Sequence, residues 1–352
     1  MNAFRILADK HARLGVAVSG GSDSLALLML AVDYAAQSGV TCLAVTVDHG
    51  LRPEAAGEAR HVHRVCEALG VEHSIRTWTR AHDGPVGQDA ARQARHRLMA
   101  AWAHENDVKI LALGHTRDDR LETFLMRARQ GSGWHGLAGL MPNGVSPVWP
   151  EGRELNLVRP LLAFGREELR DELRARGMSW VEDPSNTASR FERVRMRRLL
   201  QRMDQQTHLK ALHVMDGLMH IRAAVTAEAS ALLALTRIDA GRDIAEIPLA
   251  SLDSASDEAL RRAIEALVLA AGGAERGPRG DALNRLLQRI ITRDPALGRG
   301  VTLGGAKIHV RAGALLVVSQ APSRRGNPTL PEPDWTRATR LLEAPKLGVL
   351  AV

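Results

Sequence analysis

The run Leu14-Gly15-Val16-Ala17-Val18-Ser19-Gly20-Gly21-Ser22-Asp23-Ser24 decides the fold of this chain. Its first half is a short apolar stretch that indicates a buried strand, and its second half is a Gly/Ser loop that leads into a helix over about 24–37. Two glycines after a strand let the backbone turn sharply and bring N–H groups against an anion. The start of the following helix adds free donors. The run therefore predicts a phosphate-binding loop at the end of the first strand.

Asp23 is the unusual residue of this loop, because a carboxylate beside a phosphate repels it. A magnesium ion that bridges Asp23 and phosphate oxygens removes the conflict. The simpler alternative is a Gly-Gly turn before a helix capped by Ser22. With serine hydroxyls as additional donors, the loop predicts an ATP site formed by Ser19, Gly20, Gly21, Ser22, Asp23 and Ser24.

Short apolar runs and longer helical patterns alternate over residues 13–131. Strands are expected at 14–18, 41–47, 72–78 and 108–113, and helices at 24–37, 54–69, 89–105 and 118–129. This alternation predicts an α/β fold with a doubly wound, mostly parallel sheet covered by helices on both faces. Ligands bind such sheets outside the carboxyl ends of the strands, which is where the phosphate loop, Asp48 and Gly114 fall.

Acidic residues cluster where the fourth helix begins. Gly114-His115-Thr116-Arg117-Asp118-Asp119 is followed one helical turn later by Glu122. Three acids there can simply cap the helix and offset its dipole. Beside a phosphate loop they can instead position a nucleophile or share a metal ion, which makes Asp23 and Asp119 the candidate magnesium ligands. His115 can contact a phosphate or an RNA group, or be a packed histidine.

Arginines dominate two of the expected helices, and the net charge of +7 favours an anionic partner such as RNA. Arg92 and Arg95 lie one turn apart and can face the reacting phosphate or the RNA. Spacings of three to five place several members of a second group on one helix face, which suits phosphate contacts, although a solvated charged face is the alternative. This second group is Arg190, Arg193, Arg195, Arg197, Arg198 and Arg202.

Other features bound the class of protein. Cys42 and Cys66 are the only cysteines, which argues against a disulfide framework, a four-thiolate zinc site or an iron–sulfur cluster. No signal peptide or bilayer-spanning run is visible, so a cytoplasmic protein without a membrane partner is expected. A Walker-type loop is absent. Gly131–Gly136 follows a helix, which favours a loop over the active site, with Gly133 on the substrate side.

The composition divides the chain into four parts. Residues 1–185 form the expected catalytic domain and 186–236 a helical segment that contacts the nucleic acid. Residues 237–320 form a small C-terminal α/β domain that binds substrate, and 321–352 are a tail. In the small domain, helices are expected near 257–269 and 281–291 and strands near 301–303, 306–310 and 314–318.

Several stretches together resemble one family. Ser19–Ser24 resembles the S-G-G-x-D-S signature of the pyrophosphatase-loop ATPases. The narrower resemblance, to the tRNA(Ile)-lysidine synthetases, is strong over 13–200 and rests on residues 47–52, 91–96, 113–123, 129–140, 159–162 and 182–186. The chain departs from the pattern of this narrower family at Thr116, where a second histidine is common, and at Val194, where asparagine is usual.

The resemblance implies an adenine-nucleotide α-hydrolase-like fold and a C–N bond-forming ligase that uses ATP and Mg²⁺. Its substrates would be free L-lysine and tRNA(Ile) with a CAU anticodon. The C2 carbonyl oxygen of the wobble cytosine would attack the α-phosphate of ATP, and the lysine ε-amine would then attack C2. Because the amine of free lysine has a pKa of about 10.4, a carboxylate must assist it, and Asp118, Asp119 and Glu122 are the candidates.

Three other functions are also compatible with a pyrophosphatase loop in this sequence. Alternative functions are a pyrophosphatase-loop tRNA modifier that inserts sulfur, a small-molecule amidating enzyme, and a non-catalytic tRNA-binding homologue. A homodimer is compatible with the sequence.

The catalytic residues expected are Asp23, Asp119, His115 and Arg95, with Asp48 at the adenosine. The residues expected on the substrate side are Arg92, Asp118, Glu122, Gly133, Arg193, Arg195 and Arg197.

Overall fold

The computed structural model describes residues 13–48, 50, 55–79, 87–182, 192–239, 241–275, 277–322 and 331–342. These residues form two compact units, divided between His220 and Ile221 within helix α8 (Gln205–Ala234). The expected boundary at 185, the stretch 183–186 and Arg190 lie outside the described residues. The four-part division remains a prediction.

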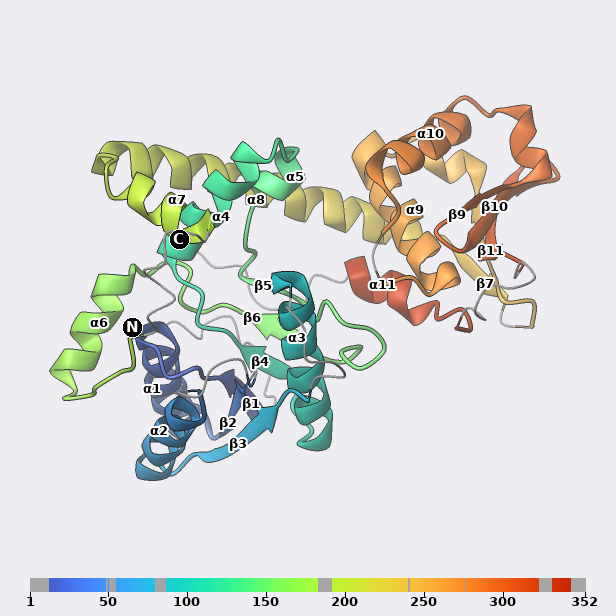
Figure 1. Ribbon diagram of the computed structural model, residues 1–352. Coiled ribbons are helices and arrows are strands. Elements are labelled where there is room, and N and C mark those ends of the chain that lie inside the picture. Colours follow the sequence, from blue (N-terminus) through green and yellow to red (C-terminus); the bar gives the residue numbers. More distant parts are fainter. Residues whose placement is uncertain are drawn as a thin grey trace. The chain divides into compact units, whose positions relative to one another are not determined.

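The first unit is built on a six-stranded sheet with the strand order β3-β2-β1-β4-β6-β5 (Figure 1). All neighbouring pairs are parallel except β5 with β6. The predicted mostly parallel sheet is confirmed, and β5 is an antiparallel edge strand that the sequence patterns did not indicate. The strands are β1 (Arg13–Ala17), β2 (Thr41–Asp48), β3 (Glu72–Thr77), β4 (Ile110–Ala112), β5 (Asn143–Val145) and β6 (Asn156–Val158).

Helices cover both faces of this sheet. Helices α1 (Ser22–Ser38), α2 (Ala55–Ala68) and α6 (Arg166–Ala175) pack on one face, and α3 (Gln88–Glu105) packs on the other. Successive strand residues point to opposite faces, so each strand contributes to both apolar cores. The doubly wound prediction is therefore confirmed.

Gly15 is needed where α3 packs on β1. A Cβ at this position would lie 2.9 Å from Val108 Cγ1 and 3.0 Å from Trp102 Cζ3. Both neighbours are almost fully buried, so neither could move aside without a cost in packing. Gly15, the first glycine of the run 14–24, thus sets how closely α3 covers the sheet.

Three further helices of the first unit lie beyond β4. They are α4 (Arg117–Arg129), the short α5 (Trp134–Leu137) and α7 (Glu192–Leu200), followed by the first part of α8. Leu121, Leu200 and Met215 form a small core between α4, α7 and α8. The helix expected through the segment 186–236 is interrupted at 201–204, because Asp204 accepts the Thr207 N–H at 2.7 Å and starts α8 there.

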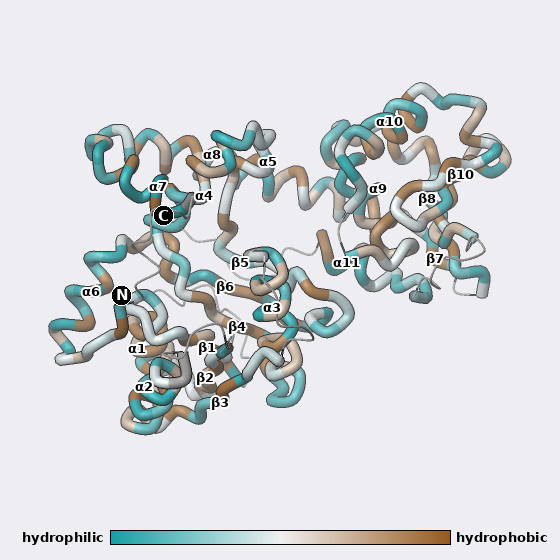
Figure 2. Tube along the Cα trace, in the orientation of Figure 1, coloured by the Kyte–Doolittle hydropathy of each residue, from teal (hydrophilic) through white to brown (hydrophobic). Residues whose placement is uncertain are grey.

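The second unit is a small α/β structure whose five-stranded antiparallel sheet has the order β7-β8-β11-β10-β9. Buried residues from its strands and helices form one hydrophobic core, and hydrophobic and hydrophilic residues alternate along its trace (Figure 2). Helix α11 falls in the expected tail and packs on α9 through the buried Ala338 and Leu342. The strands are β7 (Arg237–Asp239), β8 (Ile244–Pro248), β9 (Val301–Leu303), β10 (Ala306–Arg311) and β11 (Leu315–Gln320). The α-helices are α9 (Asp257–Gly272), α10 (Gly280–Ile291) and α11 (Thr336–Leu342). Across the described ranges, no helix is long and apolar enough to cross a membrane.

Candidate active site

A cavity of about 410 Å³ opens in the first unit at the carboxyl ends of β1, β2 and β4. Side chains from α3, α4, α6 and α7 complete its walls. The cavity therefore lies where ligands bind in parallel sheets. The phosphate loop contributes Ser19, Gly21, Ser22, Asp23 and Ser24.

Glycines shape the turn from β1 into α1. Gly20 has a φ of 86°, a left-handed conformation that other residues rarely adopt. Gly21 is the N-cap of α1 and no side chain caps the helix, which leaves the N–H groups of the first turn available to an anion. Ser22 is already the first helical residue, so the alternative in which Ser22 caps the helix is wrong.

A serine hydroxyl and a close backbone contact hold the loop in shape. The Ser24 hydroxyl accepts the Ser19 backbone N–H at 3.1 Å and donates to the Gly21 carbonyl at 3.0 Å. Gly114, after β4, lies so close that a Cβ there would be 3.2 Å from the Asp23 carbonyl oxygen. Gly114 therefore allows the end of β4 to approach the phosphate loop.

The acids at the start of α4 have separate roles. Asp119 forms a capping box with Thr116, since Asp119 Oδ2 accepts the Thr116 backbone N–H at 2.8 Å. Asp118 Oδ2 accepts the backbone N–H of Arg166 at 2.8 Å and so anchors the start of α6. The capping interpretation is thus right for one oxygen of Asp119, while its Oδ1 pairs with arginines beside the cavity.

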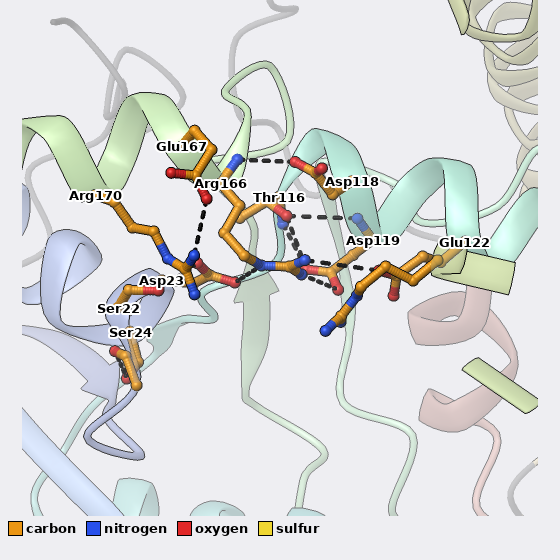
Figure 3. A network of polar contacts seen from close by, with 12 residues as sticks. Ser22, Asp23, Ser24, Thr116, Asp118, Asp119, Glu122, Arg166, Glu167 and Arg170 are labelled. Atoms are coloured by element: carbon orange, nitrogen blue, oxygen red, sulfur yellow. Dashed lines mark hydrogen bonds and ion pairs between the residues drawn. The ribbon is translucent and has the colours of Figure 1, made fainter. Parts of the chain in front are cut away.

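Arg166, the first residue of α6, lines the cavity and is a site residue that the sequence patterns did not indicate. Its guanidinium lies among three carboxylates, with Nε 3.1 Å from Asp23 Oδ2, Nη2 3.4 Å from Asp119 Oδ1 and Nη1 3.7 Å from Glu122 Oε1 (Figure 3). A cation at the first position of a helix opposes the helix dipole, and this is the signal that could have marked it. Asp23 and Asp119 are thus brought together through one guanidinium.

Two arginines of α7 point into the site. The Nε atoms of Arg193 and Arg197 each lie 2.8 Å from a carboxylate oxygen of Glu122, whose side chain is only 1% exposed. Arg195 is exposed and does not line the cavity, while Val194 is buried beneath the helix. Val194 thus contributes packing at a position where a polar residue is usual in the resembled family.

The remaining expected site residues divide between the cavity and its surroundings. Arg92, Arg95 and His115 line the same cavity as the phosphate loop. Asp48 lies at the end of β2, outside the lining, and its Oδ1 accepts the Gly50 N–H at 2.8 Å. Gly133, also outside the lining, is the N-cap of α5. The roles assigned to Asp48 and Gly133 stay predictions.

Comparison with known proteins identifies the family. Residues 2–203 match the model of the PP-loop domain. The tRNA(Ile)-lysidine synthase of Hyphomonas neptunium is 45% identical over 298 residues, which are 85% of this chain and 79% of that protein. The tRNA(Ile)-lysidine synthase of Zymomonas mobilis is 50% identical over 188 residues, 53% of this chain and 55% of that protein. The chain belongs to the tRNA(Ile)-lysidine synthase family.

A solved structure supports the fold of this family member. The U34-tRNA thiolase NcsA from Methanococcus maripaludis superimposes with a TM-score of 0.52, over 62% of this chain and 76% of that one. The two sequences are 15% identical, so the likeness concerns the fold alone.

Burial controls the charge of several residues in this tRNA(Ile)-lysidine synthase family member. Burial lowers the pKa of His115 to about 3, so its ring is neutral at neutral pH. Its Nδ1 is buried and has no hydrogen-bond partner in the described part of the chain. Burial alone would raise the pKa of Asp119, but Arg193 and Arg166 hold it below its ordinary value. At Asp23 burial outweighs Arg166, and the pKa is raised.

The carboxylates of Asp23 and Asp119 suit Mg²⁺, which prefers oxygen ligands. Both point at the Arg166 guanidinium, so their oxygens already converge on a cation. Among the residues that the structure describes, no group of three or more His, Cys, Asp or Glu is arranged to hold a metal ion. By their chemistry, Asp23 and Asp119 are the residues that would hold a magnesium ion here.

Proposed function

We propose that this protein is a tRNA(Ile)-lysidine synthase that uses ATP to join L-lysine to the wobble cytidine of the CAU-anticodon tRNA(Ile). The observation that carries the proposal is the 45% identity with the Hyphomonas neptunium synthase across 79% of that protein. The phosphate loop and Asp119 around one cavity support it, because a non-catalytic homologue would not need to keep them together.

In the first step, the cytosine C2 carbonyl oxygen attacks the α-phosphate and pyrophosphate leaves. Negative charge grows on the phosphates, so fixed donors lower the barrier most. The free N–H groups at the start of α1 and the loop serines supply such donors. Arg92 and Arg95 of α3 also line the cavity and add positive charge to it. Magnesium held by Asp23 and Asp119 would neutralise charge on the leaving pyrophosphate.

In the second step, the lysine ε-ammonium group loses a proton to water, the neutral amine attacks C2, AMP leaves, and the new C–N group loses a second proton to water. Of the three candidate carboxylates, only Asp119 lines the cavity. Asp118 is bound to the start of α6, and Glu122 is bound to arginines. Arginines hold the pKa of Asp119 low, so its carboxylate is a weak base. Asp119 would therefore attract and orient the lysine ammonium group rather than remove its proton.

The cysteines do not favour the alternative of sulfur insertion. Burial raises the pKa of Cys42 to about 12 and that of Cys66 to about 11, so both thiols stay protonated at neutral pH. Neither lines the cavity. A cytoplasmic location and a homodimer accompany the proposed function as expectations.

Incorporation of radiolabelled lysine into bulk tRNA tests the proposed function. With ATP and Mg²⁺ we expect RNA-bound label and pyrophosphate release that require both lysine and tRNA. Pyrophosphate release with another nucleophile, without label in the RNA, would show that lysine is not the substrate. No turnover with any nucleophile would favour a binding protein.

A further inference from the structure

Arg166 is held at the centre of the site from two directions. Its backbone N–H donates to Asp118, which fixes the first turn of α6. Its guanidinium, on a side chain that is 16% exposed, reaches carboxylates on both α1 and α4. Figure 3 shows this side chain lying between Asp23 on one side and Glu122 on the other. The place between the carboxylates is therefore already filled by a cation that belongs to the protein.

The three carboxylates depend on Arg166 to different degrees. Glu122 also pairs with Arg193 and Arg197, and Asp119 also pairs with Arg193 at 3.2 Å. In the described ranges, Asp23 pairs with no cation other than Arg166, and its second oxygen accepts only the Ser22 hydroxyl. A movement of Arg166 would thus leave Asp119 and Glu122 paired and would free Asp23 alone.

We propose that Arg166 is a positioning residue that takes the place of the metal between Asp23 and Asp119 until nucleotide binds, so that the site accepts a divalent cation only together with ATP. The inference rests on the proposed ATP site. It makes Arg166 the residue that sets the order in which metal and nucleotide enter.

Phosphate chemistry explains why nucleotide would draw Arg166 away. Arg166 lines the same cavity as the phosphate loop, so its guanidinium can exchange carboxylates for phosphate oxygens without leaving the site. Guanidinium groups bind phosphates through paired hydrogen bonds. A largely buried carboxylate without a partner is costly, and Asp23 would then take the divalent cation that accompanies the nucleotide.

Manganese binding to the full chain, measured by electron paramagnetic resonance without nucleotide, tests the proposal. In Arg166→Gln, the affinity of the site at Asp23 and Asp119 for one Mn²⁺ should be at least about tenfold higher than in the wild type. Arg174→Gln is the matched control, because Arg174 lies on the same helix in exposed ion pairs. The double variant Arg166→Gln with Asp23→Asn should lose the gain, and Arg166→Lys, which keeps the charge, should resemble the wild type.

A nucleotide-free wild type that binds Mn²⁺ as tightly as Arg166→Gln would overturn the proposal, and so would a folded Arg166→Gln without the gain. If circular dichroism shows that Arg166→Gln does not fold, Mn²⁺ binding to the wild type is measured with and without the ATP analogue AMPCPP. The wild type with AMPCPP should then bind more Mn²⁺ than AMPCPP binds by itself, and an unchanged amount of bound Mn²⁺ contradicts the proposal. Neither tRNA nor lysine is present, so failure of the lysidine assay and failure of this proposal are separate results.

Discussion

Asp23 stands between the phosphate loop and the arginine–carboxylate cluster. Its carboxylate is the first acid of α1, and Arg166 is its cationic partner. The loop serines and glycines could be recognised from the sequence because they are consecutive. The contact between Arg166 and Asp23 could not be predicted, because the two residues lie 143 positions apart and meet only after α6 has packed beside α1.

Asp23→Asn should abolish most turnover while leaving the fold intact. The substitution removes the negative charge that holds the metal–phosphate complex, and a loss of at least about 100-fold in kcat is expected. Pyrophosphate release measures it. Asp33→Asn is the control, because Asp33 lies on the same helix in a partly exposed pair with Arg176, away from the cavity lining. Equal rates for Asp23→Asn and the control would remove Asp23 from the mechanism.

His73 should make stability depend on pH. Its Nε2 donates to the Thr46 hydroxyl at 2.9 Å, because that hydroxyl donates to Val18, and burial lowers the pKa of His73 to about 4. The unfolded chain binds this proton near pH 6.5 and the folded one only near 4, so stability is lost as pH falls through that window. The free energy of unfolding should fall by about 1 kcal/mol for each pH unit in this window. This is less than the limit of about 1.4 kcal/mol per pH unit for one proton, because the ring is partly exposed.

Urea unfolding of the wild type, His73→Gln and the exposed-site control His104→Gln at several pH values measures this slope. His73→Gln should be less sensitive than the other two between pH 6.5 and 4. Parallel curves for all three proteins would show that His73 does not contribute.

At the scale of elements, α7 is attached to α4 through one buried carboxylate. Sequence periodicity indicated that several arginines share a face of α7, but not that this face turns inward. The direction of this face depends on tertiary packing. Val194, Met196 and Leu200 are buried where α7 packs on α4. The predicted contact of Arg193 and Arg197 with tRNA remains a prediction.

Glu122→Gln should loosen α7. The change leaves Arg193 and Arg197 without their shared anion, and we expect a loss of roughly 2 kcal/mol, less than for a fully buried pair because both arginines are partly exposed. Urea unfolding gives the loss, and hydrogen exchange should show faster exchange in α7. Glu167→Gln, which affects an exposed pair with Arg170, is the control. Exchange in α7 that matches this control would contradict the attachment.

In the whole molecule, apolar periodicity made the parallel sheet of the first unit and its helical layers predictable. It also indicated the helices near 257–269 and 281–291 and the strands near 301–303, 306–310 and 314–318 of the second unit, but not that this second sheet is antiparallel. The edge strand β5, the break at 201–204 and α11 were not predictable, because short elements carry little periodic signal. The net charge of +7 remains the sequence feature that points to an RNA partner.

Arg195→Ala should weaken tRNA binding without affecting the cavity, because Arg195 is exposed on α7 and does not line it. Loss of one phosphate contact should reduce the slope of log affinity against log salt by about 1. Filter binding at several salt concentrations measures this slope, with Arg174→Ala as control. An unchanged slope would place the RNA elsewhere on the protein.

Analysis of nucleotide 34 tests directly whether this protein converts the wobble cytidine into lysidine. A CAU-anticodon tRNA(Ile) transcript and its C34U variant are incubated with the protein, ATP, Mg²⁺ and lysine, and the digested nucleosides are examined by mass spectrometry. We predict that the cytidine at position 34 gains one lysine, that the C34U transcript gains none, and that AMP and pyrophosphate form in equal amount. An unmodified C34 with active protein, or lysine attached equally to the C34U transcript, would contradict the account.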